Sequence, residues 1–188
     1  MKNPPHSGQK PKQMPAEADL QQLIESGKKA FKSKSYLLAA ETFGSAAQAY
    51  AGQGDDLLAA EMKNNQSVAL LQAGKVQESL DAARGTETVF AGTNDKKRSA
   101  MALGNQAAAL EALDRLDEAL TYYERSADLF AQAGEADLRS TVLKSAAAIK
   151  LKRGQLTEAG FKMIGALEAK SKPSFLERIL RFFLRRSL

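Results

Sequence analysis

The chain has 188 residues, a formal net charge of +5, 44% hydrophobic residues and 26% charged residues, proportions typical of one globular domain. Its abundant alanine and scarce valine and isoleucine favour helices over sheets. The absence of cysteine excludes disulfides, thiolate zinc sites and a cysteine nucleophile. No apolar run approaches the roughly 20 residues that span a bilayer, so we expect a cytoplasmic protein.

Residues 1–16 form a polar segment rich in proline and lysine, and this composition predicts disorder. The segment lacks the apolar stretch of a signal peptide and the arginine-rich pattern of a transit peptide. It contains His6, the only histidine of the chain. With no second histidine and no cysteine, His6 completes neither a metal cluster nor a catalytic triad.

A repeat of forty residues follows, from residue 17 to about residue 170. The hexapeptides FAGTND and FAQAGE begin at Phe90 and Phe130, and YAGQGD begins at Tyr50. Within each unit, apolar residues recur at intervals of three and four, which predicts helices with one buried face. A single helical hairpin cannot bury that face alone, so we expect four hairpins that stack on one another.

Glycine marks the turn inside two of the units. Gly74 and Gly154 follow the expected first helix of their hairpins, and a glycine in the left-handed conformation commonly ends a helix. Lys34 and Asp114 hold the same position in the other two units. We expect a weaker stop there, because these residues adopt the left-handed conformation less readily.

Small and aromatic residues recur at fixed positions of the repeat. In the first and third units they are Gly27, Ala39, Phe43 and Ala46, and Ala107, Ala119, Tyr123 and Ser126. The second unit departs from this pattern with Ser79, Ala83 and Thr86, and the fourth has Met163 in place of the aromatic residue. The pattern resembles the tetratricopeptide repeat, in the kinesin light chain-like variety whose repeats exceed the usual length of about 34 residues. The resemblance implies an all-α fold, a right-handed α-solenoid of four hairpins with a concave groove.

The same resemblance implies which residues line the groove. On the first helices of the second, third and fourth units they are Asn64, Asn65, Val68, Gly104, Asn105, Ala108, Lys144, Ser145 and Ala148. Asn65 and Asn105 occupy the same repeat position, and their carboxamides offer both donors and acceptors that can clamp the backbone of an extended peptide. The alternative is that these asparagines pack between repeats or face water.

Residue clusters that would carry catalysis are absent from the sequence. The stretch GQGDD, residues 52–56, lacks the Lys-Ser/Thr of a phosphate-binding loop and follows no strand. Asp117 and Glu118 lie at an expected helix start, where acidic side chains complement the helix dipole. We therefore expect no enzyme activity, no cofactor and no metal. A binding site for the acidic tails of chaperones is also disfavoured, because Ile24 and Met101 stand where the resemblance requires cations.

The end of the chain from Ala169 onward carries the whole excess of positive charge, with six basic residues and one acidic residue, and five of these basic residues lie in the last segment, residues 171–188. Ser174 and Glu177 form a capping box that predicts the start of a helix. The predicted helix has an apolar face and a basic face, formed by Phe175, Leu176, Ile179, Leu180, Phe182 and Phe183, and by Arg178, Arg181, Arg185 and Arg186. This pattern is typical of a helix at an anionic membrane surface, but also fits a cap on the array or a docking helix for a protein.

The sequence as a whole predicts a non-enzymatic adaptor whose groove binds a protein or peptide and whose last helix can tether it to a membrane. The alternative is a structural or self-associating subunit whose last helix caps the solenoid or docks into a partner. A nucleic-acid partner is disfavoured, because the body is neutral and the basic residues gather in the tail. We expect the protein in the cytoplasm, with a peripheral position at a membrane if the tail binds lipid.

Overall fold

The structure, a computed structural model, describes residues 17–152 together with residues 160, 162, 163, 165 and 166. In this part of the chain it consists of helices joined by short turns and contains no strand. The helices are α1 (Glu17–Lys32), α2 (Tyr36–Gly52), α3 (Asp56–Gln72), α4 (Val76–Ala83), α5 (Thr86–Gly92), α6 (Lys96–Ala112), α7 (Leu116–Gln132) and α8 (Ala136–Lys152). The predicted all-α class is confirmed.

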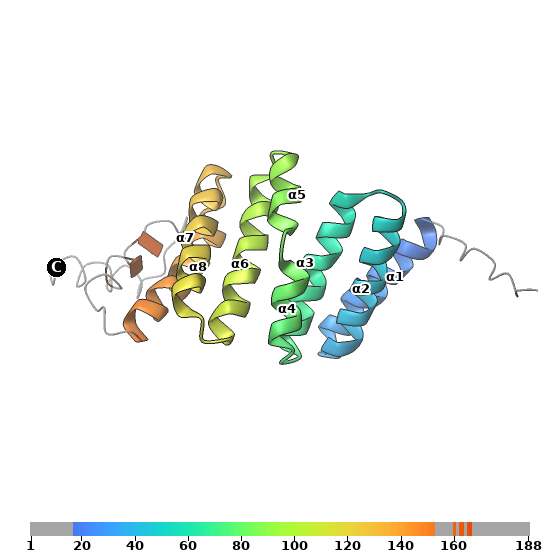
Figure 1. Cartoon of the computed structure of the whole chain (residues 1–188), viewed down its shortest axis with the longest axis horizontal. Coiled ribbons are helices and arrows are strands. Elements are labelled where there is room, and N and C mark those ends of the chain that lie inside the picture. Colours follow the sequence, from blue (N-terminus) through green and yellow to red (C-terminus); the bar gives the residue numbers. More distant parts are fainter. Residues whose placement is uncertain (1–16, 153–159, 161, 164, 167–188) are drawn as a thin grey trace, which may run out of the picture.

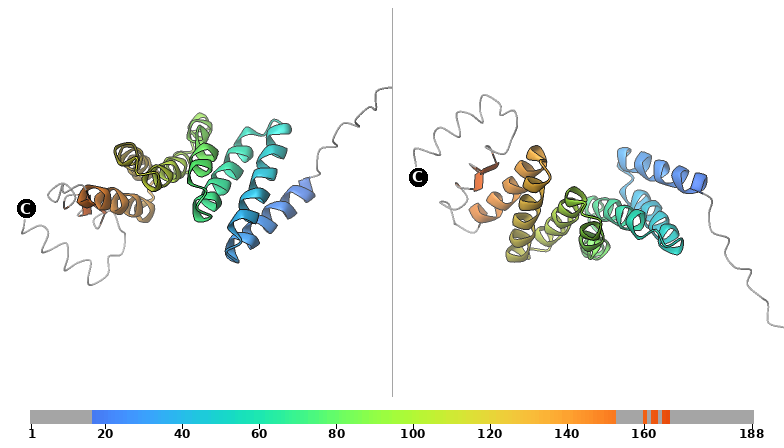
Figure 2. Two further views of the ribbon diagram at one scale, coloured as in Figure 1. Left: turned by 60° about the horizontal axis from the view of Figure 1, so that its bottom comes forward. Right: turned by 90° about the horizontal axis from the view of Figure 1, so that it is seen from above.

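Each helix packs mainly against the helices next to it in the sequence. Helix α2 packs on α1 and α3, and α7 packs on α6 and α8. Figure 1 shows the helices side by side in chain order, with α4 and α5 end to end. The two further views in Figure 2 agree that α1 and α8 lie at opposite ends of this row. Packing is therefore local, as expected when each hairpin covers the face of its neighbours.

The turns between the long helices recur every twenty residues and share one backbone conformation. Each contains a single residue with φ between 57° and 77°, at Lys34, Gly54, Gly74, Asn94, Asp114 and Gly134. The amide of the next residue donates to a carbonyl five positions back, as Ser35 N does to Ala30 O at 2.9 Å. This is the hydrogen bond that closes a helix at a left-handed residue. Lys34 and Asp114 thus form the same stop as Gly74.

The helix boundaries follow the forty-residue repeat. Helices α3, α6 and α8 begin forty residues apart, at Asp56, Lys96 and Ala136. Helices α2 and α7, the second helices of the first and third hairpins, begin eighty residues apart, at Tyr36 and Leu116. The repeat therefore sets the length of every long helix.

The second hairpin differs from this pattern, because its second helix is broken. It begins at Val76, as the repeat predicts, but α4 ends at Ala83 and α5 begins at Thr86. Between them, Gly85 has a φ of 81° and Arg84 has a ψ of 130°, both outside the helical region. Two short helices thus stand where the sequence predicts one.

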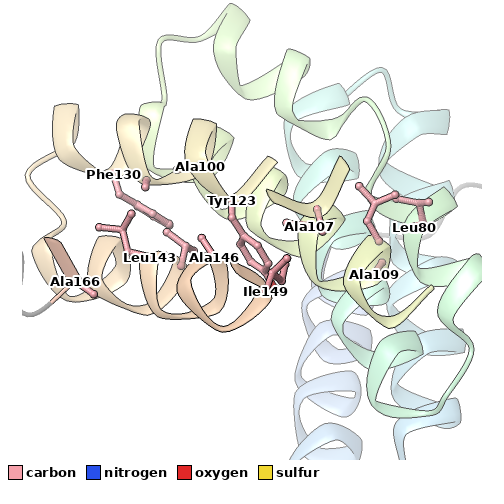
Figure 3. Close-up of a cluster of buried hydrophobic side chains, with 14 residues drawn as sticks. Leu80, Ala100, Ala107, Ala109, Tyr123, Phe130, Leu143, Ala146, Ile149 and Ala166 are labelled. Carbon is pink, nitrogen blue, oxygen red and sulfur yellow. The ribbon is translucent and has the colours of Figure 1, made fainter. Parts of the chain in front are cut away.

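The buried apolar side chains form two large clusters and one small one. The first cluster lies in α1, α2 and α3 and includes Leu20, Phe43 and Tyr50. The other large cluster lies mainly in α6, α7 and α8, where Tyr123, Phe130, Leu143 and Ile149 face one another (Figure 3). Ala60, Phe90 and Ala102 form the small cluster. The core is therefore divided at the second hairpin.

Several predicted segments lie wholly or partly outside the described residues. They are residues 1–16, the turn at Gly154, most of the last hairpin's second helix and the segment 171–188 with all its predicted docking residues. Of the last hairpin, Ala166 is helical and buried against the cluster of α6 to α8. Lys162 lies 3.1 Å from the carboxylate of Glu124 on α7.

Candidate functional site

A pocket of about 270 Å³ lies between α1, α2 and α3. It is lined by Lys28, Phe31 and Lys32 of α1, Phe43 of α2, and Asn65 and Val68 of α3. Two of the predicted groove residues, Asn65 and Val68, therefore meet at one site. We call this site the Asn65 pocket.

The shape of the Asn65 pocket depends on a glycine. A Cβ atom on Gly27 would lie 2.9 Å from Cε1 of Phe43, closer than side chains tolerate. Glycine therefore lets the Phe43 ring pack directly against the α1 backbone. The ring is almost fully buried and forms an apolar wall of the pocket. The predicted pairing of a small residue with an aromatic one in the first hairpin is what builds this wall.

Asn65 is the uncharged polar residue among those that line the pocket. Its side chain is half-buried, and within the described residues its carboxamide makes no hydrogen bond. A carboxamide offers two donors and one acceptor oxygen, and a half-buried one gains free energy when a partner satisfies them. Placed beside apolar walls, it can pair with the backbone of a segment whose side chain enters the pocket.

Asn64 and Asn105 lie together but point into the protein. The Asn64 oxygen accepts hydrogen bonds from Thr86 Oγ1 at 3.2 Å and from Asn105 Nδ2 at 3.4 Å. The Asn64 side chain is buried, with 8% of its surface exposed, and Asn105 is half-buried. The two asparagines of the predicted clamp therefore differ, since Asn105 has an internal partner and Asn65 has none among the described residues.

The remaining predicted groove residues lie on α6 and α8. Ala108, Lys144 and Ser145 are half-buried there. Ser145 forms a hydrogen bond with the hydroxyl of Tyr123 on α7, and that hydroxyl donates to Glu111 Oε2 at 2.8 Å. Burial, together with the charge of Glu111, raises the pKa of Tyr123 far above its ordinary value. Ser145 thus belongs to a buried polar contact as well as to the predicted groove.

Two further pockets lie where second helices meet a first helix, and the sequence did not suggest them. One, of about 330 Å³, lies at α5, α6 and α7, and the other, of about 260 Å³, lies at α2, α3 and α5. Six residues of one lie forty positions from six of the other, namely Ala51, Asp56, Ala59, Lys63, Gly85 and Val89 against Ala91, Lys96, Ser99, Leu103, Arg125 and Leu129. They are one feature of the repeat, seen twice.

A shallow hollow of about 390 Å³ opens at the turn between α1 and α2, lined by residues 34–38 and Ala73. Leu37 and Leu38 are 53% and 57% exposed there, the highest exposures of large apolar side chains in the described part of the chain. They are not among the repeat positions from which the sequence predicts contacts. Aligning the units would have found them, because other units carry polar residues at these positions.

Metal ligands do not gather in the described part of the chain, where no three histidine, cysteine, aspartate or glutamate side chains are placed to hold an ion. Its helices are also too short or too polar to cross a membrane. In comparisons with known proteins, the chain matches no family model and no curated protein. The likeness to tetratricopeptide repeats therefore rests on the repeat positions and stays a prediction.

Proposed function

We propose that the chain is a non-enzymatic adaptor that binds a segment of a partner protein on the face formed by α1, α3, α6 and α8. In this proposal, four hairpins form a right-handed α-solenoid of the tetratricopeptide type, and these first helices line its concave face. The local packing of each helix on its sequence neighbours supports the arrangement.

The observation that carries the proposal is the Asn65 pocket. It combines an apolar hollow between two adjacent first helices with a carboxamide that has no hydrogen-bond partner among the described residues. A bound segment would fill the hollow with an apolar side chain and pair its backbone with Asn65. Both interactions are those by which grooves lined with helices recognise peptides.

The test begins with a random dodecapeptide library displayed on phage and selected on the full-length chain. Fluorescence anisotropy then gives the affinity of each selected peptide. Asn65→Ala should weaken binding about tenfold, since a bound backbone group left without its partner costs roughly 1–3 kcal/mol. Gln48→Ala, an exposed change on α2 away from the pocket, is the matched control. If the selected peptides bind both variants equally well, the Asn65 pocket is not the site.

For residues 174–188 we propose reversible binding to anionic membranes, on the sequence pattern alone. Burial of the apolar face contributes about 25 cal/mol per Å², and each arginine near an anionic surface adds on the order of 1 kcal/mol. Flotation of the full-length chain with liposomes should therefore require anionic lipid and weaken with salt. Phe182→Glu should abolish it. If the full-length chain does not float with liposomes and deletion of 174–188 clearly lowers the melting temperature, the segment is a cap instead.

A further inference from the structure

The segment 28–38, which joins α1 to α2, is strongly cationic. It contains Lys28, Lys29, Lys32 and Lys34, and no acidic residue lies between Glu25 and Glu41. All four lysines are exposed. Lys28 pairs with Glu25 at 2.7 Å, whereas the other three form no ion pair within the described residues. We call residues 28–38 the corner segment.

The charge of the corner segment contrasts with the body around it. Residues 17–152 contain 16 lysine and arginine residues against 19 aspartate and glutamate residues, a net charge of −3. Lys29 and Lys32 lie in the last turn of α1, where cations stabilise the helix dipole. That role does not explain Lys34, which follows the helix.

Lys34 occupies a backbone conformation that disfavours lysine. Its φ is 61°, and the five equivalent turn residues are Gly54, Gly74, Asn94, Asp114 and Gly134, types that adopt this conformation more readily. Lysine is the residue type least suited to this conformation among the six, and its presence points to a use for the side chain that the fold does not require.

The exposed leucines of the corner segment also depart from the repeat. Where the first unit has Leu37 and Leu38, the second has Gln77 and Glu78, and the third has Asp117 and Glu118. Helices α4 and α7 begin normally with these polar residues, so the hairpin fold does not need leucine there. An exposed apolar pair held in one unit alone indicates contact with another molecule.

An aromatic pair joins this surface to the Asn65 pocket. The rings of Phe31, which lines the pocket, and Tyr36, which lines the shallow hollow, are 5.3 Å apart in an edge-to-face contact. Lysines flank both hollows, with Lys28 and Lys32 at the pocket and Lys34 at the other. The two hollows therefore form one surface, apolar in its depressions and cationic around them.

We propose that this surface binds a segment of a partner protein in which carboxylate side chains flank bulky apolar side chains. The proposal rests on the proposed function and names the chemistry of the partner. Charge complementarity requires the carboxylates, because Lys32 and Lys34, at the edges of the two hollows, form no ion pair within the described residues. The pocket requires a projecting apolar side chain, which a protein segment offers and a flat lipid surface does not.

The test uses the same dodecapeptide selection on the full-length chain, and its readout is the composition of the selected peptides. We expect aspartate or glutamate next to phenylalanine, tryptophan or leucine, with affinities that fall as salt is added. Lys28→Gln with Lys32→Gln should weaken these peptides at least fivefold. Leu37→Gln with Leu38→Glu gives the first unit the residues of the second. Peptides selected on this variant should no longer prefer the apolar side chain that contacts the shallow hollow.

Lys34→Gly makes the sharpest variant, because it removes a charge and relieves backbone strain at once. The melting temperature should rise while the affinity for acidic peptides falls about threefold, a combination that misfolding cannot produce. Asp114→Gly is the matched control, since it also places glycine at a left-handed turn, in the third unit, and removes only the exposed ion pair of Asp114 with Lys152 at 3.0 Å. It should raise the melting temperature and leave peptide affinity unchanged.

The other outcomes separate this inference from the proposed function. Selected peptides that depend on Asn65 but show no acidic preference would overturn the inference and leave the adaptor function standing. Failure to select any peptide would overturn both. Binding to vesicles of phosphatidylcholine and phosphatidylserine that Leu37→Gln with Leu38→Glu abolishes, without effect on peptides, would assign the corner segment to a membrane and overturn the inference.

Discussion

The second helices of the first and third hairpins differ from that of the second hairpin at one buried position. Helix α2 carries Phe43 there and α7 carries Tyr123, and both helices run unbroken for 17 residues. The second hairpin has Ala83 at this position, and its helix ends there. In the first hairpin the Phe43 ring packs against Gly27 of α1, whereas an alanine at this position is too small to make the equivalent contact.

Polar contacts replace the missing ring in the second hairpin. Thr86 Oγ1 donates to the Ala83 carbonyl at 2.7 Å, which satisfies a group that the broken helix leaves free. Ser79 Oγ donates to the Ser67 carbonyl at 2.8 Å, and Asn64 bonds to Thr86 and Asn105. The second hairpin thus has these buried hydrogen bonds and no aromatic ring at the position where the first and third hairpins carry one.

The largest expected effect comes from giving the first hairpin the residue of the second. Phe43→Ala removes a buried ring that packs on Gly27. We expect a loss of about 3–5 kcal/mol in the free energy of unfolding, measured by urea denaturation. Leu38→Ala, an exposed change on the same helix, should lie within about 0.5 kcal/mol of the unchanged chain. Equal effects would mean that the ring does not hold the unbroken helix.

The second prediction concerns the polar contacts of the broken helix. Thr86→Val keeps the volume of the buried side chain but leaves the Ala83 carbonyl without its donor, so stability should fall by about 1–3 kcal/mol. Thr42→Val on α2 is the control, because the hydroxyl of Thr42 bonds only to Leu38 O one turn back, on a partly exposed helix surface. If both changes lower the free energy of unfolding by the same few tenths of a kcal/mol, Thr86 does not stabilise the broken helix.

The helices and turns could be predicted because their causes lie close together in the sequence. Apolar spacing and the forty-residue repeat locate every long helix, and the twenty-residue spacing of the turns follows from it. The break after Ala83 could not be predicted with the same means. The sequence shows that Ala83 and Thr86 depart from the pattern, but it does not reveal the hydrogen bond between Thr86 and Asn64, 22 residues apart, that accompanies the break.

The candidate site, too, could be predicted from the sequence only in part. Repeat position brought Asn65 and Val68 to notice, and the structure places both at one pocket. Repeat position could not distinguish Asn65 from Asn105, because the hydrogen bond from Asn105 to Asn64 joins residues 41 positions apart. The leucines of the corner segment were missed for the opposite reason. They differ from the other units rather than repeat with them, and only their exposure shows that the fold leaves them at the surface.

The third prediction uses pH to probe the unbroken third hairpin. Burial raises the pKa of the Tyr123 hydroxyl from its ordinary value of 10.0, so the folded state favours the neutral form. The resulting stability is present in full below pH 10 and is lost as pH rises from 10 towards the higher folded pKa. The loss should reach about 1.4 kcal/mol at pH 11.

Tyr123→Phe should flatten this alkaline dependence, as measured by urea denaturation at pH 8, 10 and 11. A residual slope should remain, because the pKa of Tyr50 is also raised, by burial and by Glu17. Tyr122→Phe on the same helix is the control and should keep the full slope. An unchanged slope in Tyr123→Phe would contradict the burial of its hydroxyl against Glu111.

The smallest expected effect tests whether glycine itself allows the break. Gly85 has a φ of 81°, so alanine there should cost about 1 kcal/mol in the free energy of unfolding. Gly52, at the end of the unbroken α2, does not have a positive φ, and nothing lies within 4 Å of a Cβ built on it. Gly52→Ala should therefore raise stability by about 0.5–1 kcal/mol through helix propensity. The two changes are chemically identical, yet they should act with opposite signs, because Gly85 is left-handed and Gly52 is helical. A gain in both variants, with increased ellipticity at 222 nm for Gly85→Ala, would show that the second hairpin forms a continuous helix once glycine is removed. In that case the missing ring at Ala83 would not suffice to break it.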